Sequence, residues 1–141
     1  MRVLIPVDGS KSALRAVSHV AETAGLYAGG VEVHLLNVQM PILSGNVRSF
    51  VGQDKLQAYY HDEGMAILEP ACSVMKAANL PCRIHIGVGN VAQTILDYAR
   101  EMKCDQICMG KGGMGAISGM LLGSVASRLI HISEIPLLLV H

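Results

Sequence analysis

The chain has 141 residues, a length typical of one domain that buries a core without metals or disulfides. Lys plus Arg and Asp plus Glu both number 11, and no basic stretch is interleaved with aromatic residues, which argues against a nucleic-acid partner. Apolar residues make up 51% of the chain but aromatic ones only 4%, a composition that suits a parallel sheet covered by helices. We therefore expect a single domain over residues 1–141.

The chain begins with an apolar run at residues 3–7 that predicts a strand. The run is too short for a membrane span or a signal-peptide core, so we expect a cytoplasmic protein that does not enter a membrane. Ser10 follows the strand and is a suitable cap for a helix. That helix has an apolar face with spacings of three and four and ends before Gly29 and Gly30. The face consists of Leu14, Val17, Ala21 and Ala24.

The rest of the chain continues the alternation of strands and helices. Further strands are predicted at residues 31–38, 82–88, 105–109 and 135–140. Helices are predicted at residues 54–80, from residue 90 onward, and at 124–131. Gly64 and Pro70 predict a kink or two shorter helices in the first of these, and Asn90 with Gln93 resembles a capping box. Residues 39–53 have no clear period and are interpreted as a surface loop or lid.

This order predicts a doubly wound α/β fold, a five-stranded parallel sheet with helices on both faces, because crossover connections are right-handed. Pro6 cannot donate a hydrogen bond to a neighbouring strand, which usually restricts proline to sheet edges. We nevertheless place Pro6 near the end of a central strand.

The cysteines and histidines do not predict a metal site. Cys104 and Cys108 are the closest pair of thiols, and on one strand they would lie roughly 13 Å apart, too far to share an ion. Small buried thiols are the favoured interpretation. The six histidines show no metal-binding spacing on one element, and we expect most to be surface residues or satisfied core residues.

The segment from Met109 to Ser124 carries the most chemical information, because it contains six of the fifteen glycines. A phosphate can approach a backbone where side chains are missing, and successive amide groups then bind it. Gly110, Gly112 and Gly113 provide such a turn directly after a strand. Gly123 and Ser124 open a helix, whose free amide groups and positive dipole end favour an anion.

The position of this loop in the predicted sheet adds a second argument. Ligands of open α/β sheets bind beyond the carboxyl ends of the strands, where the strand order reverses. Asp8, Val38 and Gly110 all lie at that edge. By spacing alone the loop could equally be a flexible connection, and neither a Walker motif nor a dinucleotide fingerprint is present.

The chain resembles the universal stress protein family, and within it the small single-domain, ATP-binding (UspA-like) subgroup. The resemblance rests on residues 3–10, 35–38 and 105–110. Its most specific part is a signature in which a glycine, two residues, a glycine and nine residues precede Gly-Ser or Gly-Thr. Gly110, Gly113, Gly123 and Ser124 fit that spacing.

The resemblance implies a strand order of 3-2-1-4-5, a homodimer, and a nucleotide-dependent role in stress response or signalling. It implies ATP and Mg²⁺ as cofactors, with Asp8 near the ribose and the magnesium and the backbone of Val38 at the adenine. The complete predicted binding set is Pro6, Val7, Asp8, Val38, Met109, Gly110, Lys111, Gly112, Gly113, Gly123, Ser124, Val125 and Ala126. Two positions depart from the family pattern: Lys111-Gly112 replaces a common Ser-Arg pair, and Asn37 replaces a common His.

Residues 110–128 contain no carboxylate and no histidine, so we expect ATP hydrolysis to be slow or absent. One alternative function is a scaffold of the same fold that acts through protein partners without a nucleotide. An adenylating enzyme is disfavoured, because that class needs a Ser-Gly-Gly loop where this chain has Asp8-Gly9-Ser10. The last strand, 135–140, would join two copies if it formed an exposed edge, although Pro136 could also protect it.

Overall fold

Five parallel strands form one sheet in the order β3-β2-β1-β4-β5, as predicted. The computed structural model describes residues 1–42, 45–113 and 122–141, without the side chains of residues 47 and 48. The strands are β1 (Arg2–Pro6), β2 (Glu32–Gln39), β3 (Cys82–Val88), β4 (Gln106–Gly110) and β5 (Leu137–Val140). β1 lies at the centre of the sheet, and β3 and β5 form its edges.

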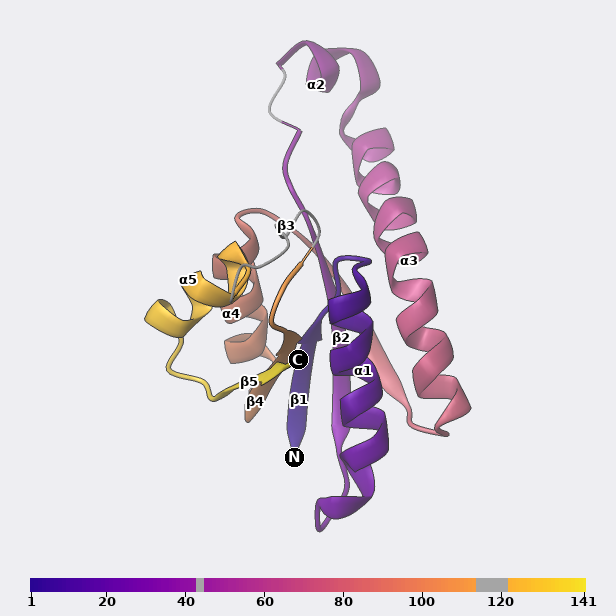
Figure 1. Cartoon of the computed structure of the whole chain (residues 1–141). Coiled ribbons are helices and arrows are strands. Elements are labelled where there is room, and N and C mark those ends of the chain that lie inside the picture. The colour runs from indigo at the N-terminus through magenta and orange to yellow at the C-terminus, as the bar shows by residue number, and fades with distance from the viewer. Residues whose placement is uncertain (43–44, 114–121) are drawn as a thin grey trace.

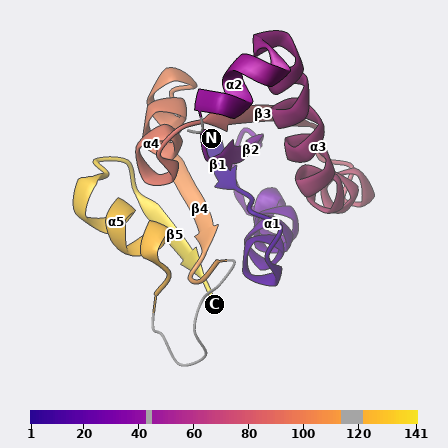
Figure 2. The same ribbon diagram turned by 90° about the horizontal axis from the view of Figure 1, so that it is seen from above.

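Helices cover both faces of this sheet (Figures 1 and 2). α1 (Lys11–Thr23) and α3 (Gln53–Ala77) lie on one face, and α4 (Val91–Glu101) and α5 (Ser124–Ile132) lie on the other. Alternate strand residues serve the two faces, because successive side chains of a strand point in opposite directions. In β1, Val3 and Ile5 pack under α1 and α3, whereas Leu4 packs under α4 and α5. This burial on both sides explains why β1 is a continuous apolar run after Arg2.

β1 pairs unequally with its two neighbouring strands. It pairs with β2 over five positions, the last being Pro6 with Leu36, but with β4 at only two, Val3 with Gln106 and Leu4 with Ile107. Pro6 therefore stands at the end of a central strand, as predicted. Its missing amide hydrogen is tolerated there because pairing with β4 has already stopped.

The helix caps follow the predicted residues with one difference. The Ser10 hydroxyl accepts a hydrogen bond from the Ala13 amide (3.1 Å), and the Asn90 side chain accepts one from the Gln93 amide (3.1 Å). The Gln93 side chain donates to Asp97 instead of returning to Asn90, so only half of the predicted capping box forms. α1 ends at Thr23, and a single turn of 3-10 helix, η1 (Ala24–Leu26), leads toward the two glycines.

The prediction for residues 39–53 is wrong, and for the helix with Gly64 and Pro70 the structure excludes the alternative of two shorter helices. Residues 39–53 are not simply a loop, because β2 extends to Gln39 and a short helix, α2 (Gly45–Val51), follows it. α3 is one continuous helix that contains both Gly64 and Pro70. Gly64 has a packing role, since a Cβ atom there would lie 2.8 Å from the Ile86 side chain on β3. The glycine therefore allows the helix to approach the sheet closely.

The prediction that the cysteines are buried thiols is confirmed for two of the four. Cys104 and Cys108 are buried, and burial raises the pKa of each thiol to about 11. Cys72 and Cys82 are half-buried. Within the described ranges, no three His, Cys, Asp or Glu side chains are grouped so that they could hold a metal ion. The helices in these ranges are also too short or too polar to cross a membrane.

Candidate functional site

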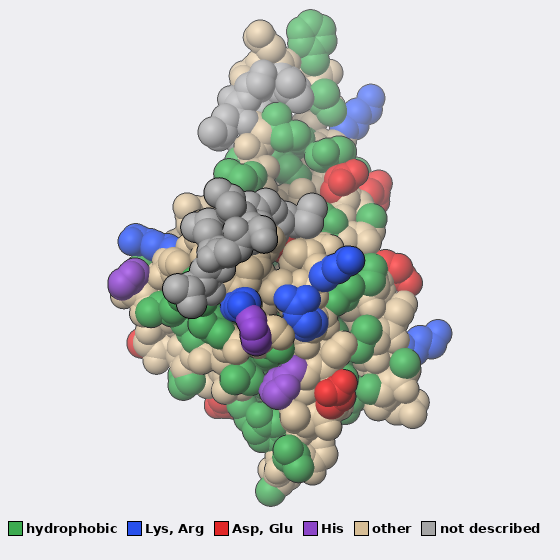
Figure 3. Space-filling view, viewed as in Figure 1, with side chains coloured by type: hydrophobic (Ala, Val, Ile, Leu, Met, Phe, Trp, Pro, Cys, Tyr) green, Lys and Arg blue, Asp and Glu red, His purple; other side chains and the backbone are tan. Residues whose placement is uncertain are grey.

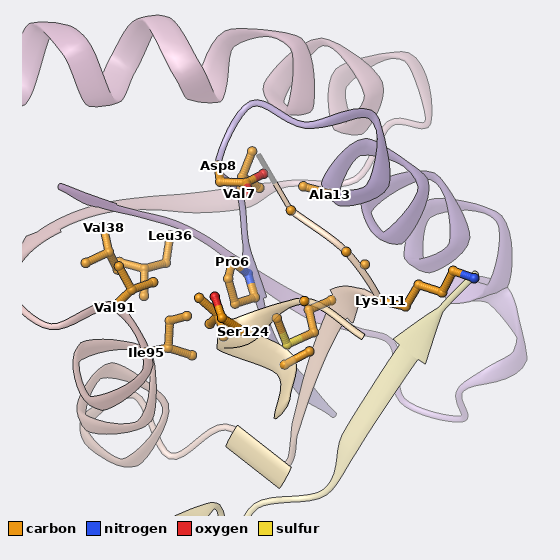
Figure 4. A pocket seen from close by; sticks show the side chains of 17 residues that line it. Pro6, Val7, Asp8, Ala13, Leu36, Val38, Val91, Ile95, Lys111 and Ser124 are labelled. Carbon is orange, nitrogen blue, oxygen red and sulfur yellow. The ribbon is translucent and has the colours of Figure 1, made fainter. Parts of the chain in front are cut away.

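A cavity of about 260 Å³ opens at the carboxyl edge of the sheet, beside the point where the strand order reverses between β1 and β4 (Figure 4). It is the position at which open α/β sheets bind ligands. The lining residues are Pro6, Val7, Asp8, Ala13, Leu36, Val38, Val91, Ile95, Met109, Gly110, Lys111, Gly112, Gly113, Gly123, Ser124, Val125 and Ala126.

All thirteen residues of the predicted binding set line this one cavity. Four further lining residues, Ala13, Leu36, Val91 and Ile95, were missed. These side chains are apolar and are typical of core residues. Residue spacing does not show that Val91 and Ile95, near the N-terminal end of α4, also reach the cavity. Residues 114–121 of the glycine-rich loop lie outside the described residues.

Ser12 in the first turn of α1 fixes the start of the glycine-rich loop. A Cβ atom at Gly110 would collide with the hydroxyl and the carbonyl oxygen of Ser12, so the helix and the loop can touch only at a glycine. The amide of Gly112 lies 3.3 Å from the Ser12 hydroxyl and donates a hydrogen bond to it. Contact with the helix thus positions the loop on one side.

The far end of the loop returns to its beginning. The Gly123 amide donates a hydrogen bond to the Lys111 carbonyl (2.7 Å). A Cβ atom at Gly123 would lie 3.4 Å from the Cα of Gly112 and from the amide nitrogen of Gly113, closer than most such contacts. The two glycine-containing segments therefore lie against each other, and they present main chain to the cavity.

α5 begins at this point with Gly123 as its N-cap, a residue that has no side chain with which to cap the first turn. Ser124 is the first helical residue and is exposed at the cavity. The first amide groups of a helix lack partners within the helix, and the helix dipole places partial positive charge there. The end of α5 can therefore accept an anion.

Asp8 braces the turn after β1 and also faces the loop. Its Oδ1 accepts a hydrogen bond from the Ser10 amide (2.9 Å). Its Oδ2 would lie 2.7 Å from a Cβ atom at Gly113, so a side chain there would displace the carboxylate. The turn-bracing interpretation and the site interpretation of Asp8 are thus compatible, because the two carboxylate oxygens face different groups.

Lys111 lines the cavity, but its charged end does not point toward the centre of the cavity. Its side chain extends away from Pro6 and Ser124 (Figure 4), and its Nζ lies 3.4 Å from Nε2 of His141 at the chain end. Lys and Arg side chains gather on the same face of the molecule as the loop (Figure 3).

The end of the cavity away from the glycine-rich loop is apolar, and hydrogen bonds of Asn37 stabilise the strands beside it. This buried side chain donates a hydrogen bond to the Val7 carbonyl (2.8 Å) and accepts one from the Gln39 amide group (2.6 Å). It ties the end of β1 to β2. Val38 lies two residues beyond Leu36, the last residue of β2 that pairs with β1, and lines the cavity with Val91 and Ile95.

These features define a doubly wound α/β protein with a main-chain cradle at the point where its strand order reverses. The sequence model of the Universal stress protein family matches residues 1–141, and the chain belongs to that family. A relative, Universal stress protein Sll1654 of Synechocystis sp., is 30% identical over 141 residues, which cover 98% of this chain and 83% of the relative.

Solved structures agree with this assignment. The hypothetical protein MJ0577 has a TM-score of 0.83 at 29% identity, with 99% of this chain and 94% of that one covered. A universal stress protein in complex with cAMP has a TM-score of 0.69 at 28% identity, with 100% of this chain and 96% of that one covered.

Proposed function

We propose that the chain binds ATP with Mg²⁺ in the cavity and acts as a nucleotide-dependent stress-response module. The observation that carries the proposal is the cradle built from Gly110, Gly112, Gly113 and Gly123. Contacts with Ser12 and Asp8 leave no room for a Cβ atom at Gly110 and Gly113 unless those residues shift, and Gly123 lies against the main chain of Gly112 and Gly113. Backbone amides that lie next to a helix N-terminus are a suitable phosphate site.

The apolar end of the cavity supports an adenine base. β2 continues past the end of its pairing with β1, so Val38 has no β1 partner and lines the cavity, while on its other side it pairs with Gly87 of β3. A backbone amide and carbonyl offer one donor and one acceptor, which match the acceptor and donor of the adenine Watson–Crick edge. Leu36, Val91 and Ile95 provide the apolar surface on which a base would lie.

Asp8 is suited to the magnesium that accompanies the phosphates. Carboxylate oxygens are preferred ligands of Mg²⁺, which is commonly held by one carboxylate and substrate phosphates. The exposed Asp8 faces Gly113 in the cradle, so its carboxylate could help to hold a metal that accompanies bound phosphates. Mg²⁺ would neutralise phosphate charge at this point.

The relative solved with cAMP supports an adenine nucleotide as the ligand class. We favour ATP because its longer phosphate chain can contact both the loop amides and the first turn of α5. Among the described residues, Asp8 is the one carboxylate that lines the cavity, and it already accepts a hydrogen bond from Ser10, so we expect slow hydrolysis or none. The binding of ATP, rather than its hydrolysis, would then determine the functional state of the protein.

We further propose a homodimer through β5. This strand is an edge of the sheet, and each of its residues, Leu137–Val140, is half-buried. Pairing two copies along this edge would cover the apolar side chains and satisfy the open hydrogen-bonding groups of the strand.

Isothermal titration calorimetry with Mg-ATP tests the nucleotide proposal. Saturable binding is expected for the native chain and for Gly25→Val, where a new Cβ atom meets no atom within 4 Å. Gly113→Val should lose binding, because its side chain would enter the space next to Asp8. Absence of binding to the native folded protein would instead favour the scaffold without nucleotide.

A further inference from the structure

Two histidines from neighbouring strands meet beneath α4, outside the lining of the cavity. His34 on β2 is 2% exposed, and His85 on the edge strand β3 is half-buried. Their rings are stacked with centroids 5.1 Å apart, and Nδ1 of His34 lies 2.9 Å from Nε2 of His85. At this distance one proton must lie between the two nitrogens, because two lone pairs or two N–H groups would repel.

Glu32 determines which ring supplies that proton. Its Oε1 lies 3.3 Å from Nε2 of His34, which forms no aligned hydrogen bond within the described residues. A carboxylate favours an N–H group on that nitrogen, which leaves Nδ1 of neutral His34 as an acceptor. His85 must then donate from Nε2, and its Nδ1 is left as the position where a further proton would be added.

Charged groups on every neighbouring element affect this pair. Arg2 on β1 and Arg83 on β3 form ion pairs with Glu32 and oppose a positive charge on the His34 ring. On α4, the Tyr98 ring contacts His85 edge-on at 5.8 Å, and Glu101 acts in the opposite direction by favouring its charged form. Burial is the main cause that lowers the pKa of His34 and of His85 below the usual value, so both rings are neutral at pH 7.

We propose that Glu32, His34 and His85 form a proton-sensitive latch, which holds the edge strand β3 and α4 on the sheet near neutral pH and releases them in acid. One further proton, added to this neutral pair, would place a positive charge on stacked rings that are buried or half-buried and that Arg2 and Arg83 already disfavour charging. β3 is an edge strand and pairs with β2 alone, at seven positions that include His34 with Arg83 and Leu36 with His85. Tyr98 would move with it, since its hydroxyl donates to the Ile86 carbonyl of β3 (3.2 Å).

The latch can affect the cavity without touching it. On β2, Val38 follows His34 by four residues and shares its face of the sheet, and on α4, Ile95 precedes Tyr98 by three residues. Both Val38 and Ile95 line the cavity. Movement of β3 and α4 would therefore loosen one wall of the cavity. The latch itself does not depend on the proposed nucleotide.

The direction of the pH effect follows from the lowered pKa values. Above the ordinary histidine pKa both folded and unfolded chains carry neutral rings, and the stabilisation is fully present. As pH falls through about 6.5, the unfolded chain takes up protons that the folded chain refuses, so stability is lost. Two such histidines would change the unfolding equilibrium constant by up to ~100-fold per pH unit.

Urea unfolding of the full chain between about pH 5.5 and 7.5 tests the latch. The decisive variant is His85→Gln, which keeps an N–H donor near the Nε2 position but cannot be protonated. It should remove about one proton of uptake, so the equilibrium constant should vary ~10-fold less per pH unit than in the native chain. The matched control is His131→Gln, since His131 is exposed on α5. Equal pH dependence in the His85 variant and the native chain would overturn the proposal.

Nitrogen NMR of the native protein gives a second test that needs no variant. We expect His34 to carry its proton on Nε2 at pH 7.5, and both rings to titrate below the ordinary histidine pKa. If His34 and His85 instead titrate at or above that ordinary value, the latch does not exist. Both experiments are independent of nucleotide, so their failure would leave the ATP proposal untouched.

Discussion

The hydroxyl of Ser12 accepts a hydrogen bond from the amide of Gly112 at 3.3 Å, and it thereby joins the first turn of α1 to the glycine-rich loop. This contact links two elements that are 100 residues apart in the chain. The loop therefore takes its position from the helix that follows β1, and not from its own sequence alone.

Replacing Ser12 by Ala should weaken Mg-ATP binding while the fold remains intact. The loss of one hydrogen bond that orders the loop corresponds to about 1 kcal/mol, or roughly a fivefold weaker affinity. Calorimetric titration would measure the change, with Ser18→Ala on the same helix as the control. If the two variants bind equally well, the Ser12 contact does not order the site.

Asn37→Ala should destabilise the protein. The buried side chain bonds to the Val7 carbonyl and to the Gln39 side chain, so its removal leaves buried polar groups without partners, at a cost of about 1–3 kcal/mol. The free energy of unfolding in urea would show this loss. Asn46→Ala, at an exposed position, provides the comparison and should change stability very little. Matching values for the two variants would contradict the bracing role.

Gly64→Ala separates helix propensity from packing. In an exposed helix the substitution would stabilise by roughly 0.5–1 kcal/mol. Here the new methyl group would lie 2.8 Å from the Ile86 side chain, and overpacking of this kind costs about 1–3 kcal/mol. We expect a net loss in the free energy of unfolding, partly restored by Ile86→Val. A more stable Gly64→Ala protein would show that the helix can move away from β3.

The thiols should differ in reactivity. At pH 8, a thiol with a pKa of about 11 is ~0.1% ionised, and Cys104 and Cys108 are also inaccessible. Cys72 and Cys82 are half-buried, although burial raises the pKa of these thiols as well. Mass spectrometry after alkylation of the folded protein should find label on Cys72 or Cys82 first. Early labelling of Cys108 would indicate that the sheet opens.

Strand order and the position of the loop were legible in the sequence, because buried parallel strands are continuous apolar runs and the glycines have a specific spacing. α2 was not, since seven residues with an exposed Phe50 carry no apolar period. The meeting of His34 and His85 depends on the register between β2 and β3, which residue spacing does not reveal. The direction of the Lys111 side chain likewise depends on His141, which is distant in the chain.

The unequal pairing of β1 has a consequence for how durable the cavity is. The strand leaves β4 after Leu4 but stays with β2 to Pro6, so the sheet splits into a wedge-shaped opening at its carboxyl edge. Pro6, the last residue of β1, has no amide hydrogen with which to extend the pairing toward β4. The opening is thus a property of the sheet itself. Rearranging the loops around it would change access to the cavity but would not change the strands that form its base.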